Sequence, residues 1–383
     1  MLWKRRHYLD VAAGVAGNPS SPHEEGRRAK AMLEDARTIL ARRIEVQTDD
    51  IIFTSGATES NALAILGTVH ARRLLAGADA AGRNNMHVLY LPTAHASVVE
   101  NVGLLAQEGV SIEALPIREY RVDIAALAAM IRPETVLITM DAVCGETGVV
   151  WNTREVAEVV KRLHAGRTTP RPLLHIDASQ APWTEKITRD HFGADLLTFD
   201  ASKVSTVRGC GVLVAHRTIP LVPLYRGGGQ ERGLRPGTEA PELAHHFARA
   251  LSLAASGRDA FRTSAAQARR ELIAVIMQGV EGVYIQEGRA QVPNILNLSL
   301  PGRDTDYLVA LLNEEGYAIA TRSACETDSE DGSRAVFALT GDRERALATL
   351  RISWGPAVRA RELQAFGRAL VSAITFIDSN RQR

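Results

Sequence analysis

The chain has 383 residues, of which 45% are hydrophobic and 23% are charged, and its formal net charge is +1. This composition is that of a globular protein, and the balanced charge gives no reason to expect nucleic acid or an anionic membrane as a partner. No signal-peptide pattern follows the first residues, and no run approaches the roughly 18 apolar residues that a membrane span needs. We therefore expect a cytoplasmic protein.

Short β-branched runs alternate with amphipathic stretches through the first two thirds of the chain. Helices are expected at 59–75 and 154–165, where apolar residues recur three and four positions apart. Strands are expected at 51–54, 87–91, 135–143, 173–177, 196–200 and 211–216. Apolar strands separated by helices predict an α/β fold with a mainly parallel sheet and helices on both of its faces.

After about residue 250 the pattern changes to a long helical stretch that is followed by short strands and helices. We interpret residues 9–250 as a large domain and residues 251–383, together with residues 1–8, as a smaller α+β domain. Ligands of parallel α/β sheets bind at the carboxyl ends of the strands. The residues that directly follow each predicted strand are therefore the place to look for a site.

Small residues follow the first strand, in the segment SGATES at 55–60. Ala57 and Thr58, at the start of a helix, would offer free N–H groups and a hydroxyl to an anion such as a phosphate. A well-capped helix without a ligand is the alternative interpretation, because signals of this kind are common at helix starts.

Asp177 ends one predicted strand, and Lys203 closely follows another. The two side chains are either a surface ion pair or parts of a site for pyridoxal 5'-phosphate. That coenzyme needs a lysine for its imine, a carboxylate for its ring nitrogen and a cradle for its phosphate. His95, after another strand, would stack on the ring in such a site and would otherwise be a hydrogen-bonded bystander.

Two polar segments carry further candidates. The glycine-rich segment 225–242 is either a surface loop or an arm that brings Thr238 to an anion site of another subunit. The run 321–333 places Cys325 among residues that cannot form a core, so this thiol is either a tolerated surface cysteine or a reactive one. The three cysteines lie far apart without CxxC spacing, so we expect neither a disulfide framework nor a metal site.

A set of motifs runs in one order through nearly the whole chain. The motifs are YLD (8–10), GNPSSPHEEG (17–26), FTSGATESNALAI (53–65), His95, ETG (146–148), HIDASQ (175–180), SK (202–203), GGGQERGLRPGT (227–238), VPNILNLSLPG (292–302), SAC (323–325) and RIS (351–353). With these motifs the chain resembles the group I cysteine desulfurases of the class V aminotransferase group, which are pyridoxal phosphate enzymes. The resemblance implies a seven-stranded large domain and a homodimer.

The resemblance also implies roles for single residues. Lys203 would form the imine, Asp177 would pair with the ring nitrogen, and His95 would stack on the ring. The other implied contacts are those of Gln180 with the ring hydroxyl, of Ala57, Thr58, Ser202 and, across the dimer, Thr238 with the phosphate, and of Arg351 with the substrate carboxylate. The two-pronged guanidinium group suits that last task.

The implied reaction converts L-cysteine to L-alanine. Lys203 would remove the α-proton, and the Cys325 thiolate would attack the substrate sulfur. The persulfide formed on Cys325 would then pass to an acceptor protein, of the iron–sulfur scaffold or tRNA-thiolation type. An exposed loop suits a thiol that visits a buried coenzyme and then presents its sulfur outside.

Several positions depart from the family pattern. Asp200 and Ser202 stand where the family has a serine and a histidine that contact the phosphate, and Gly145 replaces an asparagine. Val11 likewise replaces an asparagine, and the segment after it is shortened. A carboxylate beside a phosphate would be repelled by about 4 kcal/mol per pair of unit charges at an intermediate dielectric. Two alternatives therefore stay open: a pseudoenzyme scaffold, or another class V enzyme such as an aminotransferase or a selenocysteine lyase.

Overall fold

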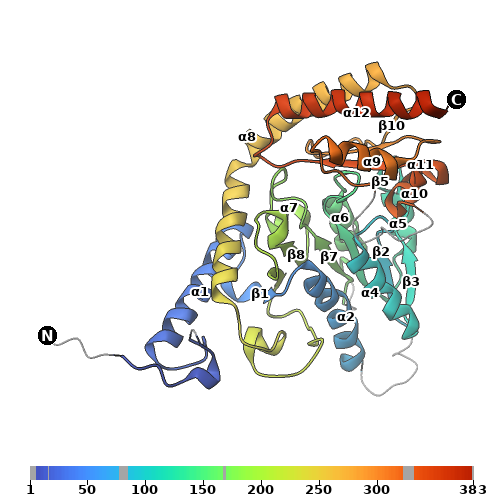
Figure 1. The fold of residues 1–383 in the computed structure, drawn as a ribbon. Helices are drawn as coiled ribbons and strands as arrows, with labels where there is room; N and C mark the ends of the chain where they lie inside the picture. Colours follow the sequence, from blue (N-terminus) through green and yellow to red (C-terminus); the bar gives the residue numbers. More distant parts are fainter. Residues whose placement is uncertain (1–5, 16, 77–84, 167–169, 322–331, 382–383) are drawn as a thin grey trace.

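The computed structural model describes residues 6–15, 17–76, 85–166, 170–321 and 332–381. A seven-stranded sheet with the order β1-β9-β8-β7-β6-β2-β3 forms its centre (Figure 1). Its strands are β1 (Ile51–Thr54), β2 (His87–Tyr90), β3 (Ser111–Ala114), β6 (Thr135–Asp141), β7 (Leu173–Asp177), β8 (Leu196–Asp200) and β9 (Gly211–Ala215). Only β9 runs antiparallel to its neighbours β1 and β8. The predicted mainly parallel sheet is thus confirmed.

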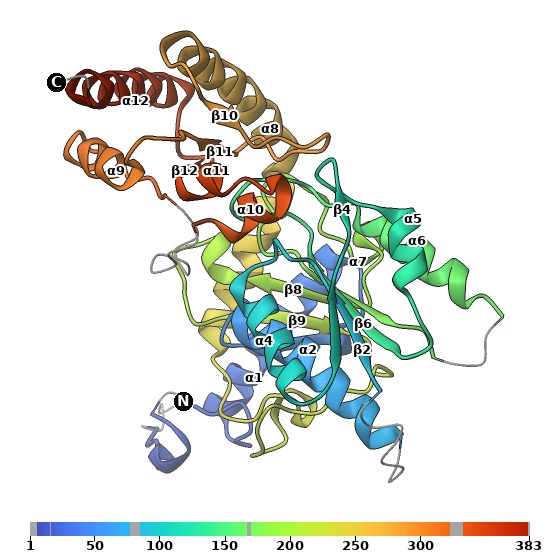
Figure 2. The same cartoon turned by 90° about the vertical axis from the view of Figure 1, so that its right-hand side faces the viewer.

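Helices cover both faces of this sheet. From β1 to β2 and from β2 to β3 the chain moves toward one edge of the sheet, and from β6 to β7 and from β7 to β8 it moves toward the other. Because such crossovers are right-handed, these two directions place their helices on opposite faces. One face carries α2 (Ala57–Leu75) and α4 (Ala96–Gln107), and the other carries α5 (Ile124–Met130), α6 (Thr153–His164) and α7 (Arg189–Phe192) (Figure 2).

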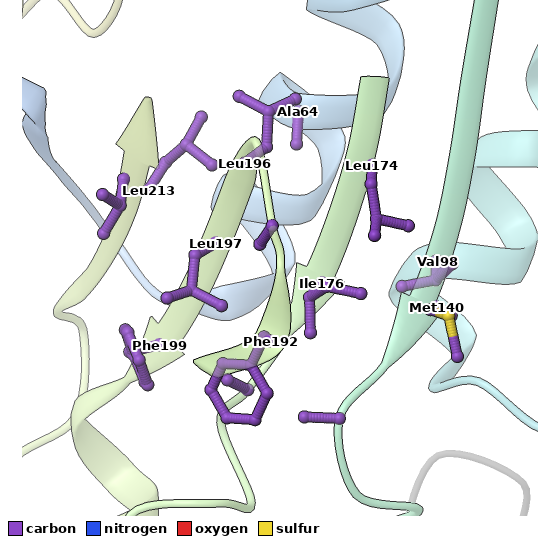
Figure 3. Packing of buried hydrophobic residues seen from close by; sticks show 14 of the residues in the cluster. Ala64, Val98, Met140, Leu174, Ile176, Phe192, Leu196, Leu197, Phe199 and Leu213 are labelled. Atoms are coloured by element: carbon purple, nitrogen blue, oxygen red, sulfur yellow. The ribbon is translucent and has the colours of Figure 1, made fainter. Parts of the chain in front are cut away.

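The central strands are largely apolar because both faces of the sheet are covered. Every residue of β7 and of β9 is buried. Figure 3 shows Leu174 and Ile176 of β7, Leu197 of β8 and Leu213 of β9 in one continuous core. This packing holds the carboxyl ends of β6, β7 and β8 in fixed relative positions, and the side chains that line the site begin there.

A second, smaller core lies beyond the sheet. It is built around the antiparallel strands β10 (Tyr284–Ile285), β11 (Ile295–Ser299) and β12 (Thr349–Ser353), in that order. Its helices are α9 (Thr305–Glu314) and α12 (Ala360–Arg381), and between them lie α10 (Arg334–Thr340), whose Ala335 packs in the first core, and α11 (Arg343–Leu347). In Figure 1 this part lies above the large sheet, at the end where α12 runs beside α8.

The helix α8 (Pro241–Gly279) joins the two cores without interruption. Its residues up to Ala254 belong to the first core, and those from Phe261 onward belong to the second. The predicted division after residue 250 falls inside this helix and stays a prediction. The first half of α8 packs on α1 (Glu24–Ile44) (Figure 1). Arg6 forms an ion pair with Glu25 of α1, in which Arg6 Nε lies 2.5 Å from Glu25 Oε1.

The remaining elements are short and connect the larger ones. They are η1 (Val11–Ala13), η2 (Thr48–Asp50), η3 (Ala201–Lys203), η4 (Gln230–Gly233) and the two-stranded ribbon of β4 (Ile117–Arg118) and β5 (Arg121–Val122). Among the helices that the structure describes, none combines the length and the apolar character that a bilayer crossing requires. In the same part of the chain, no cluster of three or more His, Cys, Asp or Glu side chains is arranged to hold a metal ion.

Candidate active site

Three carboxylates lie at the carboxyl ends of β6, β7 and β8. Asp141 pairs in register with Asp177, and Asp200 ends the next strand. Strand side chains alternate between faces, so residues two positions earlier share the face of these acids. On that face His175 bridges its neighbours: its Nδ1 lies 2.8 Å from Thr139 Oγ1, and its Nε2 lies 3.1 Å from Thr198 Oγ1.

The three acids line a pocket of about 300 Å³ between the two cores. The large domain supplies most of its walls, and α10 and β12 of the smaller part close it. Eight of the residues predicted from the sequence line this pocket, namely Ala57, Thr58, His95, Asp177, Gln180, Ser202, Lys203 and Arg351. Residues that are far apart in the chain, and from both cores, therefore meet at one place.

Asp177 is fixed at the bottom of the pocket and is only 8% exposed. Its Oδ2 accepts a hydrogen bond from Asn61 Nδ2 at 2.7 Å, and its Oδ1 accepts one from the Ser179 N–H at 2.9 Å. Asn61 also donates to Ser97 Oγ at 2.9 Å, and this hydroxyl lies 2.8 Å from His95 Nδ1. A buried chain of polar groups thus orients the aspartate and the histidine together.

Lys203, Gln180 and Arg351 reach the pocket from three different loops and strands. Lys203 ends η3, and its carbonyl accepts a hydrogen bond from Trp183 Nε1 at 2.9 Å. Arg351 Nη1 donates to the Gly145 carbonyl at 3.3 Å. A Cβ atom at Gly145 would lie 3.1 Å from Gln180 Nε2, so the small residue at 145 makes room for this amide.

The start of α2 is occupied by a side chain of the protein itself. Asp200 Oδ2 accepts a hydrogen bond from the Ala57 N–H at 2.8 Å. Its Oδ1 accepts from the Ser202 N–H at 2.7 Å and from Ser202 Oγ at 2.6 Å. The free N–H groups and the positive end of the helix dipole attract anions, and here the nearest anion is this carboxylate.

The two cysteines of the described chain are buried and chemically quiet. Burial raises the pKa of the Cys144 thiol to about 11 and that of the Cys210 thiol to about 12. Both are therefore protonated at neutral pH, and the thiolate is the reactive form. Cys325 lies outside the described residues, so its predicted role as nucleophile stays a prediction.

Thr238 lies apart from this pocket. It is exposed in the loop between η4 and α8, and it is not one of the residues that line the pocket in the described chain. Its predicted contact would be with another subunit, and that contact also stays a prediction.

The sequence analysis missed several residues of the pocket. Asp141 is buried, and burial together with the neighbouring Asp177 raises its pKa well above the ordinary value. The rule that singled out Asp177, an acid at the end of a strand, would also have found it. Arg334, whose Nη2 donates to the Ala94 carbonyl at 2.9 Å, had no such signal because it comes from a helix that is distant in the chain.

The fold and the pocket define an enzyme of the class V aminotransferase type. The family model for class-V aminotransferases matches residues 5–366, so the chain belongs to this family. Among its relatives, a mitosomal cysteine desulfurase of Encephalitozoon cuniculi is 32% identical, and the match covers 94% of this chain and 81% of the relative. The cysteine desulfurase IscS of Dictyoglomus turgidum is 30% identical, with 92% of this chain and 90% of the relative covered.

Solved structures agree with this assignment. A NifS-like protein superimposes with a TM-score of 0.83 at 26% identity, over 94% of this chain and 92% of that one. DndA from Streptomyces lividans superimposes with a TM-score of 0.71 at 31% identity, over 91% and 94% of the two chains. The predicted family and fold are confirmed.

Proposed function

We propose that this protein is a cysteine desulfurase. In the reaction, the Cβ–S bond of L-cysteine breaks and an S–S bond to Cys325 forms, so that one thiol and one cysteine become one persulfide and one L-alanine. The curated relatives that share about 30% identity over most of the chain carry this name. The observation that carries the proposal is the meeting of Lys203, Asp177, His95 and Arg351 in one pocket of the family fold.

The chain's own groups suit the handling of an amino acid. Arg351 reaches the pocket from β12 and would hold the substrate carboxylate with its planar fork of donors. Lys203 supplies an amine that accepts and returns a proton. Because neither Cys144 nor Cys210 is ionised at neutral pH, Cys325 would be the thiol that takes the sulfur.

Enzymes of this family use pyridoxal phosphate, an electron sink that also forms an imine with a lysine. The described residues fit the ring of this group, because a buried aspartate, a histidine and a lysine surround one space. They do not fit its phosphate, since the Asp200 carboxylate already takes the Ala57 N–H and both donors of Ser202.

The same carboxylate favours a second candidate function. A protein that keeps the desulfurase fold but does not load its coenzyme would act as a scaffold or as a binding partner of sulfur-carrying proteins. Changes in groups that contact a coenzyme commonly cost orders of magnitude in rate while the fold survives.

We further propose a homodimer in the cytoplasm. In this dimer Thr238, on its exposed loop, would reach the pocket of the other subunit. The persulfide would be delivered to an acceptor protein of iron–sulfur cluster assembly or of tRNA thiolation.

The test measures alanine and protein-bound persulfide after addition of L-cysteine, with coenzyme supplied in both phosphorylated and unphosphorylated form. We expect alanine and persulfide from the wild type and from Cys210→Ala, and neither from Cys325→Ser or Lys203→Ala. An aminotransferase would keep its activity in Cys325→Ser. A wild-type protein that produces no alanine and shows no imine absorption with either coenzyme form would support the scaffold instead.

A further inference from the structure

We propose that Asp200 selects the form of the coenzyme. Its carboxylate fills the phosphate seat, by which we mean the N–H of Ala57 and the N–H and hydroxyl of Ser202 at the start of α2. The pocket therefore takes unphosphorylated pyridoxal. This inference rests on the proposed function in one respect, namely that the pocket is a coenzyme pocket. The preference for unphosphorylated pyridoxal goes beyond the proposed function, because the family resemblance implies the phosphorylated coenzyme.

The hydrogen-bond donors of this seat are already in use. The Ala57 N–H, the Ser202 N–H and the Ser202 hydroxyl all donate to the Asp200 carboxylate, at 2.8, 2.7 and 2.6 Å. Both residues, Ala57 and Ser202, are among those to which the family resemblance assigns the phosphate. A phosphate could bind them only after the carboxylate had left.

The backbone around Asp200 holds this residue in its position. It pairs in register with Gly211 of β9, and it caps η3 through the Ser202 N–H. The backbone around the seat is close-packed, since a Cβ atom at Gly56 would lie 3.2 Å from Asp200 Oδ2. A Cβ atom at Gly211 would meet the Gly56 carbonyl carbon at 2.5 Å. The local backbone therefore fixes the position of the Asp200 carboxylate.

The charge of Asp200 opposes a phosphate. The described hydrogen bonds of the Asp200 carboxylate come from neutral donors, the N–H of Ala57 and the N–H and hydroxyl of Ser202, so they leave its negative charge in place. Asp177 and Asp141 line the same pocket, and both are buried. Lys203, Arg334 and Arg351 line the pocket as well, so the repulsion that acts against a phosphate is the local one from Asp200, which occupies the donors at the start of α2.

One acceptor position of the Asp200 carboxylate remains open. A carboxylate has about four acceptor positions, and the bonds to Ala57 and Ser202 use three of them. The 5'-hydroxymethyl group of pyridoxal carries a proton that the fourth position can accept. A fully ionised phosphate has no proton to donate there, so the same side chain accepts one coenzyme form and rejects the other.

The ring end of the pocket needs no change for this ligand. Asp177 remains bonded to Asn61, and His95 remains bonded to Ser97, whichever group occupies the seat. Lys203 lines the same pocket and would form the imine with either aldehyde.

The experiment is a binding titration followed by the imine absorption and by equilibrium dialysis, with pyridoxal phosphate and with pyridoxal. The proteins are the wild type, Asp200→Ser, Asp200→Asn, and the control Asp190→Asn, which removes one acid that is 86% exposed. Lys203→Ala serves to subtract imines that form on surface lysines. Circular dichroism checks that each variant is folded, and Asp200→Asn keeps the shape of the side chain if the serine variant is unstable.

We expect the wild type and Asp190→Asn to bind pyridoxal at least about 10-fold more tightly than pyridoxal phosphate. Asp200→Ser should tighten pyridoxal phosphate by about 100-fold, and Asp200→Asn by about 10-fold, without tightening pyridoxal. Tight binding of pyridoxal phosphate to the wild type, an equal effect of Asp200→Ser on both ligands, or no binding to any protein would overturn the inference.

The outcomes separate this inference from the proposed function. If the predicted selectivity is found but no alanine forms with either coenzyme, the inference stands and the desulfurase proposal fails. If the wild type makes alanine with tightly bound pyridoxal phosphate, the desulfurase proposal stands and Asp200 is no selector.

Discussion

Acidification should destabilise this protein through His175, a residue of β7 that is fully buried. Burial lowers the pKa of His175 to about 4, from an ordinary value of 6.5. Its ring accepts and donates between Thr139 and Thr198, which suits the neutral form. The unfolded chain therefore takes up a proton near pH 6.5, and the folded chain does so only near pH 4.

The sign and the magnitude follow from this difference. Above pH 6.5 the His175 side chain is neutral in both states and does not change the free energy of unfolding. Between pH 6.5 and pH 4 the unfolded state takes up the proton more readily than the folded state, so the free energy of unfolding decreases as the pH falls. One pKa unit corresponds to about 1.36 kcal/mol, so the loss at pH 5.0 is about 2 kcal/mol and its ceiling near pH 4 is about 3 kcal/mol.

Urea unfolding followed by tryptophan fluorescence at pH 7.5 and at pH 5.0 measures this loss. His175→Gln keeps an amide between the two threonines but does not titrate, so its stability should fall by about 2 kcal/mol less than that of the wild type over this interval. His246→Gln, which removes an exposed histidine of α8, should respond like the wild type. Equal losses in the wild type and His175→Gln would refute the assignment to His175.

Three further outcomes are expected. Iodoacetamide at pH 7.5 should modify Cys325 and leave Cys144 and Cys210 unmodified in the folded protein, as read by peptide mass spectrometry, because burial raises the pKa of both buried thiols. Asn61→Ala leaves a buried oxygen of Asp177 unpaired and should lower the unfolding free energy by about 1–3 kcal/mol; no change in the urea midpoint would contradict this. Arg37→Ala breaks the buried pair with Glu231 and should cost about 3–5 kcal/mol, against at most about 1 kcal/mol for the exposed control Arg28→Ala.

The large sheet could be predicted because its signal is local. The runs at 51–54, 173–177 and 196–200 became strands with those bounds, since both faces of each are buried and the apolar residues are continuous. The edge strand β3 was missed, because its residues are partly or fully exposed and its pattern is not that of a buried strand.

The pocket could be predicted only in part. Acids and lysines at strand ends are visible in a sequence, and the rule for parallel sheets brings them to one edge. Hydrogen bonds between distant segments are not visible. The hydrogen bonds from Asn61 to Asp177 and from Arg334 to Ala94 each join residues more than 100 positions apart, and no local sequence pattern predicts them.

Asp200 shows most clearly how far the site can be predicted from the sequence. From the sequence it is a carboxylate near an implied phosphate site, and the direction of its side chain is not visible there. In the folded protein, β8 and η3 direct the carboxylate toward the Ala57 N–H and the Ser202 N–H. A helix start binds whichever anion the chain holds closest to it, and a tethered carboxylate competes with a free phosphate at a high effective concentration. One substitution at a strand end therefore changes the ligand chemistry of a site whose fold it leaves in place.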